Sequence, residues 1–252
     1  MVGVDGARGR WAVCVWDGPG RTPEVLCCER PRDVLDLARE RSAEVVGLDV
    51  PLGLADEGVR SPDAHARAWL AEQAATSPPA DRRGAASRVF MTPVRDLVRH
   101  GGTYAEVRAL ARARGLPVPS AQAFALLAHV RDWDDEAARR VDDAEQRLVE
   151  VHPELSFARM AGRVLAPKRS ARGAAQRLAT LAGPGGLGCG AAGLADALAR
   201  ADVPVGADDA LDAAAAAWSA HRVADPGPHG TALVLPEDAV ADARGVLMAI
   251  HV

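Results

Sequence analysis

The sequence predicts a mixed α/β fold that opens with the order β-β-β-α-β and carries a mostly helical insertion. Three observations support this prediction. Short apolar segments alternate with turn signals over residues 1–28, a helical pattern at 31–41 leads into an apolar strand at 44–50, and helical spacing dominates about 55–145. With 252 residues, 48% hydrophobic and 25% charged, the composition fits a single globular domain over 1–252.

The opening residues predict three antiparallel strands. Residues 1–5 form an apolar run, 10–16 form a second apolar segment, and 24–28 form a third. Asp17-Gly18-Pro19-Gly20 between the last two is a strong turn signal. Short connections of this kind are typical of an antiparallel meander.

A helix and a buried strand follow the meander. Pro31 suits the first turn of a helix, and the apolar residues up to Arg41 recur on one side. Residues 44–50 are almost continuously apolar. A strand reached through a helix usually runs parallel to an earlier strand and is buried on both faces. We therefore expect residues 44–50 beside the first strand.

The rest of the chain is predicted to be mainly helical. Within the insertion, a loop at 77–87 interrupts helices, and beyond it 146–152 predicts another strand. Pro153 opens a helix that Gly162 ends. Helices are expected at 63–75, 103–114, 120–131, 171–182, 191–202 and from Asp208 to about His221, and a small hairpin at 231–235 and 245–251.

Charge and composition restrict the functional classes. A net charge of -4 argues against a protein that coats nucleic acid by general electrostatic attraction, although a local basic groove stays open. The four cysteines show neither a disulfide framework nor a zinc-binding spacing. No apolar run is long enough to span a membrane and no signal-peptide pattern opens the chain, so we expect a cytoplasmic protein.

Carboxylates recur where predicted strands and helices meet. Asp5 ends the first strand and Asp49 ends the strand after the first helix, while 146–152 would deliver His152 and Glu154. If these strands are parallel neighbours, the side chains emerge at the same sheet edge, where open α/β sheets usually bind ligands. Each residue also fits a local role at a turn, strand end or helix start.

Two further aspartates would complete the group. Asp209 and Asp212 share one helix face, and beside Asp5 and Asp49 they would make four mutually repelling anions unless protonated or metal-bound. Carboxylate oxygens in that number suit Mg²⁺ or Mn²⁺. Two ions about 3.5–4 Å apart can activate water and stabilise the leaving oxygen of a phosphodiester.

Lys168 is the one lysine among 30 basic residues. A chain that otherwise uses arginine for positive charge retains a compact ammonium here, which can bind a phosphate as a point charge. The alternative is an ordinary solvated surface lysine.

Ordered motifs over nearly the whole chain match one known family. They are Val2-Gly3-Val4-Asp5-Gly6-Ala7-Arg8-Gly9-Arg10-Trp11, Leu48-Asp49-Val50-Pro51-Leu52-Gly53-Leu54, Ser87-Arg88-Val89-Phe90 with Pro93 and Arg95, Ser120 with Gln122, Val151-His152-Pro153-Glu154 with Phe157, Lys168, and Asp208-Asp209-Ala210-Leu211-Asp212-Ala213. The sequence thereby resembles domain-of-unknown-function family 429 (DUF429), whose members are described as predicted nucleases of the RNase H-like fold.

The resemblance implies an RNase H-like core with the meander beside two parallel strands. It also implies metal-binding positions at Asp5, Asp49, Asp209 and Asp212, and the last two resemble the final helix of RuvC-type resolvases. Ribonucleases H carry a catalytic glutamate on their first helix. Glu40 is the candidate here, but it lies near the helix end and matches no motif. The RuvC-like arrangement is therefore favoured.

Other motif residues have both functional and structural interpretations. Glu154 and His152 can supply a general base or a further ligand, or can simply start a helix. In the insertion, a lid that contacts phosphates or bases is one interpretation, and helix capping is the other. The residues concerned are Arg88, Arg95, Ser120 and Gln122.

These motifs are compatible with three different functions. The first is a Mg²⁺- or Mn²⁺-dependent nuclease that uses the four aspartates, Glu154 and Lys168 on a nucleic acid. The second is an ATPase or kinase of the actin-like class, suggested by Asp5-Gly6-Ala7-Arg8-Gly9, although that class normally needs two such cores. The third is a non-catalytic RNase H-like binding module, which would bind no divalent ion at these carboxylates.

Overall fold

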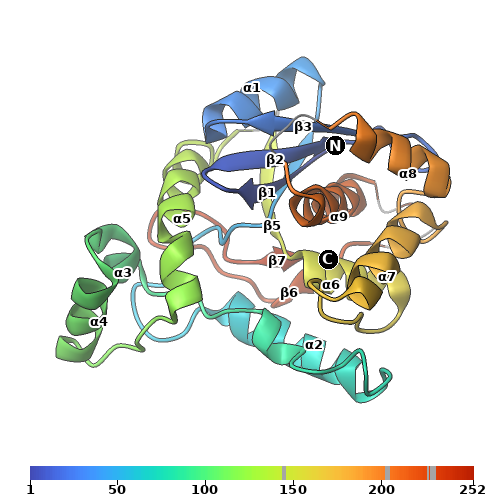
Figure 1. Ribbon diagram of the computed structural model, residues 1–252. Coiled ribbons are helices and arrows are strands. Elements are labelled where there is room, and N and C mark those ends of the chain that lie inside the picture. The colour runs from blue at the N-terminus through green and yellow to red at the C-terminus, as the bar shows by residue number, and fades with distance from the viewer. Residues whose placement is uncertain (144–145, 202–204, 226, 228–230) are drawn as a thin grey trace.

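The computed structural model describes residues 1–143, 146–201, 205–225, 227 and 231–252, which form a seven-stranded mixed sheet with helices on both faces (Figure 1). The strand order is β3-β2-β1-β4-β5-β7-β6. The strands are β1 (Val2–Ala7), β2 (Arg10–Val15), β3 (Glu24–Cys28), β4 (Val45–Leu48), β5 (Arg147–Val151), β6 (Val234–Leu235) and β7 (Ile250–His251).

Pairing directions follow the prediction. β1, β2 and β3 form the expected antiparallel meander, and β1, β4 and β5 pair in parallel at the centre. β7 extends the sheet in parallel beside β5, and β6 pairs antiparallel with β7 as the expected C-terminal hairpin. The parallel pairing brings the carboxyl ends of β4 and β5 to one edge.

Helices occupy most of the remaining chain. They are α1 (Pro31–Glu40), α2 (Ser61–Ala75), the 3-10 turn η1 (Ala86–Arg88), α3 (Arg95–His100), α4 (Tyr104–Ala113), α5 (Ala121–Arg139), α6 (Pro153–Ala161), α7 (Ala171–Ala182), α8 (Gly190–Ala199) and α9 (Ala207–Ala224). Within the described part of the chain, every helix is too short or too polar to span a lipid bilayer.

Two helices differ from the sequence expectation. α5 continues to Arg139 rather than ending near 131, because its later turns bury Trp133 against the core. α3 has six residues and was not anticipated, since a helix this short carries no recognisable period. Residues 144–145 at the expected end of the insertion, and residue 202 at the expected end of a helix, lie outside the described residues.

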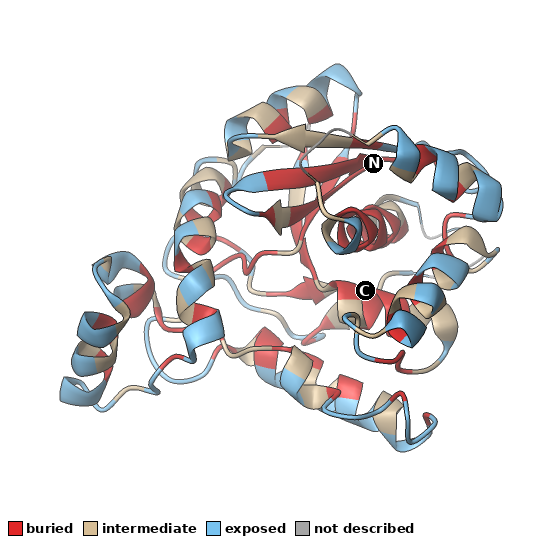
Figure 2. Ribbon diagram, in the orientation of Figure 1, coloured by how far each residue is buried: buried red, intermediate tan, exposed pale blue. Residues whose placement is uncertain are grey.

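The two faces of the sheet have different partners. α1 and α5 cover one face, where the indole of Trp11 meets Trp133 edge-on at 5.5 Å between ring centroids. α9 packs on the other face against β1, β2 and β4 and is buried along most of its length (Figure 2). Although α5 belongs to the segment expected as an insertion, it completes the main hydrophobic core.

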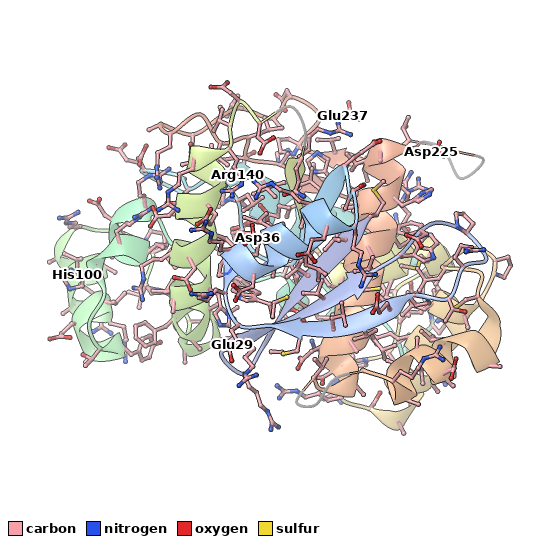
Figure 3. The ribbon with its side chains drawn as sticks, turned by 90° about the horizontal axis from the view of Figure 1, so that it is seen from above. Glu29, Asp36, His100, Arg140, Asp225 and Glu237 are labelled. Atoms are coloured by element: carbon pink, nitrogen blue, oxygen red, sulfur yellow. The ribbon has the colours of Figure 1, made fainter. Side chains whose placement is uncertain are left out.

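Two pairs of outer helices lie at opposite ends of the molecule. α3 and α4 extend beyond α5, whereas α7 and α8 lie across α9 on the far side (Figures 1 and 3). His100, at the end of α3, marks the first of these ends in the view from above (Figure 3).

Two glycines bring α9 into contact with the sheet. Gly3 of β1 is the register partner of Gly47 of β4, and both face α9. A Cβ added to Gly3 would lie 2.0 Å from the backbone nitrogen of Ala217 and 2.2 Å from the carbonyl oxygen of Ala213. No side chain fits in that space, so glycine and the alanine face of α9 set the distance between helix and sheet.

Candidate functional site

A cavity of about 710 Å³ lies at the sheet edge where β4 and β5 end. Segments far apart in the sequence form its wall: the end of β1, the turns after β4 and β5, the loop before α7, the start of α9 and one face of α5. The predicted site residues that line it are Asp5, Asp49, Arg88, Gln122, His152, Glu154, Lys168, Asp209 and Asp212. The fold therefore brings together all four aspartates expected from the sequence.

Strand geometry explains how the first two aspartates meet. Side chains alternate along a strand, so Asp5 lies on the same face as Gly3, the face covered by α9. Asp49 follows β4 directly, and its backbone N–H donates to the carbonyl oxygen of Val4 at 2.9 Å. This bond continues the parallel pairing by one residue and places Asp49 beside Asp5.

The buried carboxyls of Asp5 and Asp49 both have raised pKa values. Burial raises the pKa of Asp49 to about 8, with a further contribution from Asp212. Burial, and then the charge of Asp49, raise the pKa of Asp5 well above its ordinary value. Near neutral pH the pair therefore carries less than two negative charges.

Asp212 is neutralised in a different way. Lys168 Nζ donates to its Oδ2 at 2.6 Å, and Asp212 is 4% exposed. Burial raises the pKa of Asp212 to about 6, and the Lys168 ammonium opposes that rise. Burial would lower the pKa of Lys168, but Asp212, Asp5 and Asp49 outweigh it and keep the ammonium charged.

Asp209 lies one turn before Asp212, at the start of α9. It is less buried than the other three aspartates, and burial followed by the charge of Asp208 raises its pKa. It therefore stands at the rim of the cluster, where a side chain can move without breaking a buried contact.

Glu154 is bound on both carboxylate oxygens. Its Oε2 accepts from Arg88 Nη1 at 2.8 Å, and its Oε1 accepts from Arg177 Nη2. Burial would raise the pKa of Glu154, but Arg177 and Arg88 outweigh burial and lower it. The expectation that Glu154 supplies a free base or ligand does not fit this geometry, because a base needs an oxygen without a cationic partner.

Arg88 is held as firmly as Glu154. Its guanidinium also donates to the carbonyl oxygens of Leu165 and Asp81, each at 2.8 Å. The side chain lines the cavity, but these bonds use its donors to join η1 to the loop before α7. Arg88 therefore shapes the wall rather than reaching out to a ligand.

His152 lies between β5 and α6 with one ring nitrogen unsatisfied. Nδ1 is buried and has no hydrogen-bond partner among the described residues. Burial lowers the pKa of the imidazole, so the ring is neutral near pH 7. A neutral imidazole beside the carboxylates can accept a proton or hydrogen-bond to a ligand.

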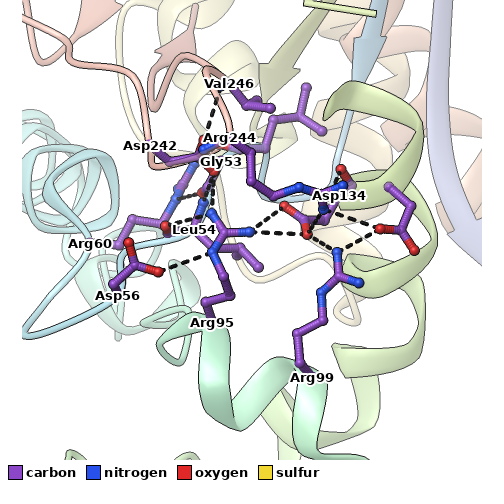
Figure 4. A network of polar contacts seen from close by, with 12 residues as sticks. Gly53, Leu54, Asp56, Arg60, Arg95, Arg99, Asp134, Asp242, Arg244 and Val246 are labelled. Atoms are coloured by element: carbon purple, nitrogen blue, oxygen red, sulfur yellow. Dashed lines mark hydrogen bonds and ion pairs between the residues drawn. The ribbon is translucent and has the colours of Figure 1, made fainter. Parts of the chain in front are cut away.

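Two expected substrate contacts lie elsewhere. Ser120 caps α5 by accepting from the backbone N–H of Ala123 at 3.1 Å, and it lines a neighbouring groove instead of the cavity. Arg95 is 14% exposed and bonds to Asp56, Asp134 and Asp242 in a separate polar network (Figure 4). The structure does not bring Arg95 to the cavity.

Among the residues that line the cavity, sequence reasoning missed two with ionisable side chains. His129 lies two turns after Gln122 on the same face of α5, where it packs on Trp11 with ring centroids 4.7 Å apart. Arg169 is exposed beside Lys168. Helical spacing from Gln122 was an available signal for His129. Adjacency to Lys168 was the corresponding signal for Arg169.

The four aspartates of the cavity supply oxygen atoms of the kind that bind a divalent cation. Among the described residues, no three His, Cys, Asp or Glu side chains are gathered closely enough to hold an ion as they stand. The chemistry of the donors nevertheless fits a hard cation, because near neutral pH the buried carboxyls depend on a retained proton and on Lys168 for charge balance. Binding an ion there would require that proton to leave and the side chains to close inward.

The family comparison decides how the chain is classified. A family model described as "Protein of unknown function (DUF429)" matches residues 3–241. The chain belongs to the DUF429 family. The match spans every residue of the candidate site, from Asp5 to Asp212, and confirms the family expected from the motifs. No curated protein and no solved structure matches this DUF429 chain significantly.

Proposed function

We propose that this DUF429 protein is a metal-dependent phosphodiesterase that acts on a nucleic acid. One observation carries the proposal: Asp5, Asp49 and Asp212, from three separate elements, meet Lys168 in a single large cavity. Four aspartates with a single ammonium form a site whose charge favours a divalent cation and a phosphate together.

The topology supports an RNase H-like core as part of the same proposal. An antiparallel meander, a crossover through α1 and parallel strands β4 and β5 form the order that this fold requires. The acidic start of α9 lies against the centre of that sheet, as the likeness to RuvC-type resolvases implies.

Each residue then has a role. Asp5, Asp49, Asp212 and the rim residue Asp209 would hold Mg²⁺ or Mn²⁺. The ion would supply Lewis-acid stabilisation of phosphate charge and a lowered pKa for a water molecule. Lys168 would leave Asp212 to contact a phosphate oxygen, since its side chain is 38% exposed and lines the cavity.

Glu154 and His152 take different parts. Glu154 would position the wall through Arg88, and His152 would accept a proton through its unsatisfied Nδ1. Both residues were expected as candidate bases, and of the two only His152 has a side-chain atom without a partner among the described residues.

The test is hydrolysis of single-stranded, duplex, hybrid and branched oligonucleotides with Mg²⁺ or Mn²⁺. We expect Asp5→Asn and Asp212→Asn to lose about 100-fold or more in kcat/KM, because each removes a donor to the ion. Asp208→Asn is the matched control, since Asp208 is exposed in the same turn and does not line the cavity. Full wild-type rates in both site variants would contradict the proposal.

A non-catalytic binding module is the second candidate. It is favoured by the charge balance within the cluster, where a proton and Lys168 already compensate the carboxylates. Isothermal titration with Mn²⁺ separates the two candidates: a binding module shows no heat that depends on Asp49 and Asp212, whereas the phosphodiesterase does.

A further inference from the structure

A second groove, of about 350 Å³, adjoins the main cavity. The two share Ser87 of η1, Phe90 just after η1, and Gln122 in the first turn of α5. A ligand that occupies the cavity can therefore continue across Phe90 into the groove without leaving the protein surface.

The walls of the groove are mainly apolar and rigid. Three prolines line it, and Val59 and Val118 stand at its surface with 56% and 42% of their area exposed. Exposed valines that line one groove are costly in water, so a surface of this kind is typical of a binding site. The proline residues are Pro93, Pro117 and Pro119.

The groove contains an arginine for which the described part of the chain supplies no partner. Arg67 of α2 is half-buried, and among the described residues no hydrogen bond or ion pair holds its guanidinium. Arg60, two helical turns earlier at the start of α2, is instead bound to Asp63 and Glu150. A half-buried guanidinium that no described carboxylate pairs with is suited to an anion supplied by a ligand.

We propose that this groove binds the nucleotide adjacent to the cleaved phosphate, with its base against the proline and valine walls and its other phosphate at Arg67. The inference rests on the proposed function and extends it to a substrate class: an unpaired, unstacked nucleotide within a single strand or a distorted duplex. In a regular duplex the base is stacked and paired, so it is not available to such a groove.

Size and charge favour a nucleotide over a protein segment. A volume near 350 Å³ is in the range of small-ligand sites, and the groove runs into the carboxylate cavity. A base supplies a flat apolar face for Val118 and Pro119 and polar edges for Ser87 and Gln122. Its phosphate supplies the negative charge that would pair with the Arg67 guanidinium.

The test compares two probes by fluorescence anisotropy, with Ca²⁺ present to limit cleavage. One is fluorescein-labelled octathymidylate, and the other is the same octamer with abasic sugars throughout. We expect wild-type protein to bind the base-bearing octamer about tenfold or more tightly, because stacking of one base on an aromatic ring has an effect of that size and Phe90 lines the groove.

Substitutions in the groove show which residues cause the preference for the base-bearing octamer. Val118→Asp should abolish the preference for bases, whereas Val240→Asp should leave it intact, since Val240 is 60% exposed and lines neither pocket. Arg67→Gln should weaken both octamers equally and lower the dependence of affinity on salt.

The outcomes separate the two proposals. Equal binding of the octamers, or a preference that survives Val118→Asp, would overturn the base groove even if the enzyme hydrolyses a small phosphodiester such as bis(p-nitrophenyl) phosphate. A preference for bases that disappears in Val118→Asp, without any hydrolysis, would support the groove and contradict the phosphodiesterase.

Discussion

Asp49 shows how one buried carboxyl links charge to stability. Its pKa rises to about 8 because the side chain is buried beside Asp212 and Asp5. In the unfolded chain the same group titrates near 3.8. The folded protein therefore holds a proton between about pH 4 and pH 8 that the unfolded chain has lost. Removal of that proton costs the folded state stability.

We expect the free energy of unfolding, measured by urea denaturation in EDTA, to fall as pH rises through this window. The slope for one such group is about 1.4 kcal/mol per pH unit at most. Asp49→Asn should make the fall shallower, because the amide cannot ionise. Identical slopes in wild type and variant would show that Asp49 ionises freely.

Lys168 illustrates a residue that its rarity singled out. A guanidinium cannot replace its point contact with Asp212 without changing geometry, because arginine presents several donors in a fixed plane. In the structure this lysine lies at the acidic cluster, paired with Asp212. Its contact with a phosphate stays a prediction.

At the level of elements, the contact between α9 and the sheet controls the site. Gly3 and Gly47 let the helix backbone approach, and Asp212 then lies beside the carboxyl end of β1. The Asp-x-x-Asp pattern would not reach Asp5 if either glycine carried a side chain.

Gly3→Ala should therefore destabilise the fold by about 3 kcal/mol, since its Cβ meets the backbone of α9 and not a flexible side chain. Urea denaturation measures the loss. Gly185→Ala serves as the comparison, because its Cβ would lie 3.3 Å from the carbonyl oxygen of Met160. A Gly3→Ala variant as stable as Gly185→Ala would mean that α9 moves away at little cost.

The turn after β4 is a second element held by its surroundings. Arg60 donates to the carbonyl oxygens of Gly53 and Leu52 at 2.8 and 2.6 Å, and it pairs with Glu150 of β5. Glu150 in turn accepts from the backbone N–H of Leu52 at 2.8 Å. These buried bonds fix the chain just beyond Asp49, so they hold that carboxyl in place indirectly.

Across the whole molecule, a polar network ties the C-terminal segment to the helical middle. Asp134 of α5 is fully buried and accepts from Arg95, Arg99 and Arg244 (Figure 4). Asp242 accepts from Arg95 and from the backbone N–H of Leu54. The network joins α3, α5, the turn after β4 and the chain before β7.

Arg95→Gln should lower stability by roughly 3 kcal/mol, because it removes the guanidinium that pairs with buried Asp242, whereas Asp134 keeps Arg99 and Arg244. Catalysis per folded molecule should not change, since Arg95 lies outside the cavity. Arg114→Gln is the control, as its pair with Asp96 is half-exposed and contributes about 1 kcal/mol or less. A raised KM with unchanged stability would instead show that Arg95 contacts the substrate.

Local spacing in the amino-acid sequence was enough to predict the mixed α/β class, the meander, the parallel strands and most helices. It also identified Asp5 and Asp49, because a carboxylate at the end of a buried strand is recognisable from its neighbours alone. Asp209 and Asp212 were recognisable for a similar reason, since residues three apart share a helix face.

Contacts between distant segments could not be predicted in this way. That Glu154 is bound by Arg177 and Arg88, and that Arg95 belongs to a network with Asp134, depends on chain segments that only folding brings together. The same holds for the groove beside Phe90, whose walls come from α2, α3 and the chain before α5. Periodicity reports on near neighbours along the chain, whereas ion pairing and cavity shape depend on where remote side chains lie in space.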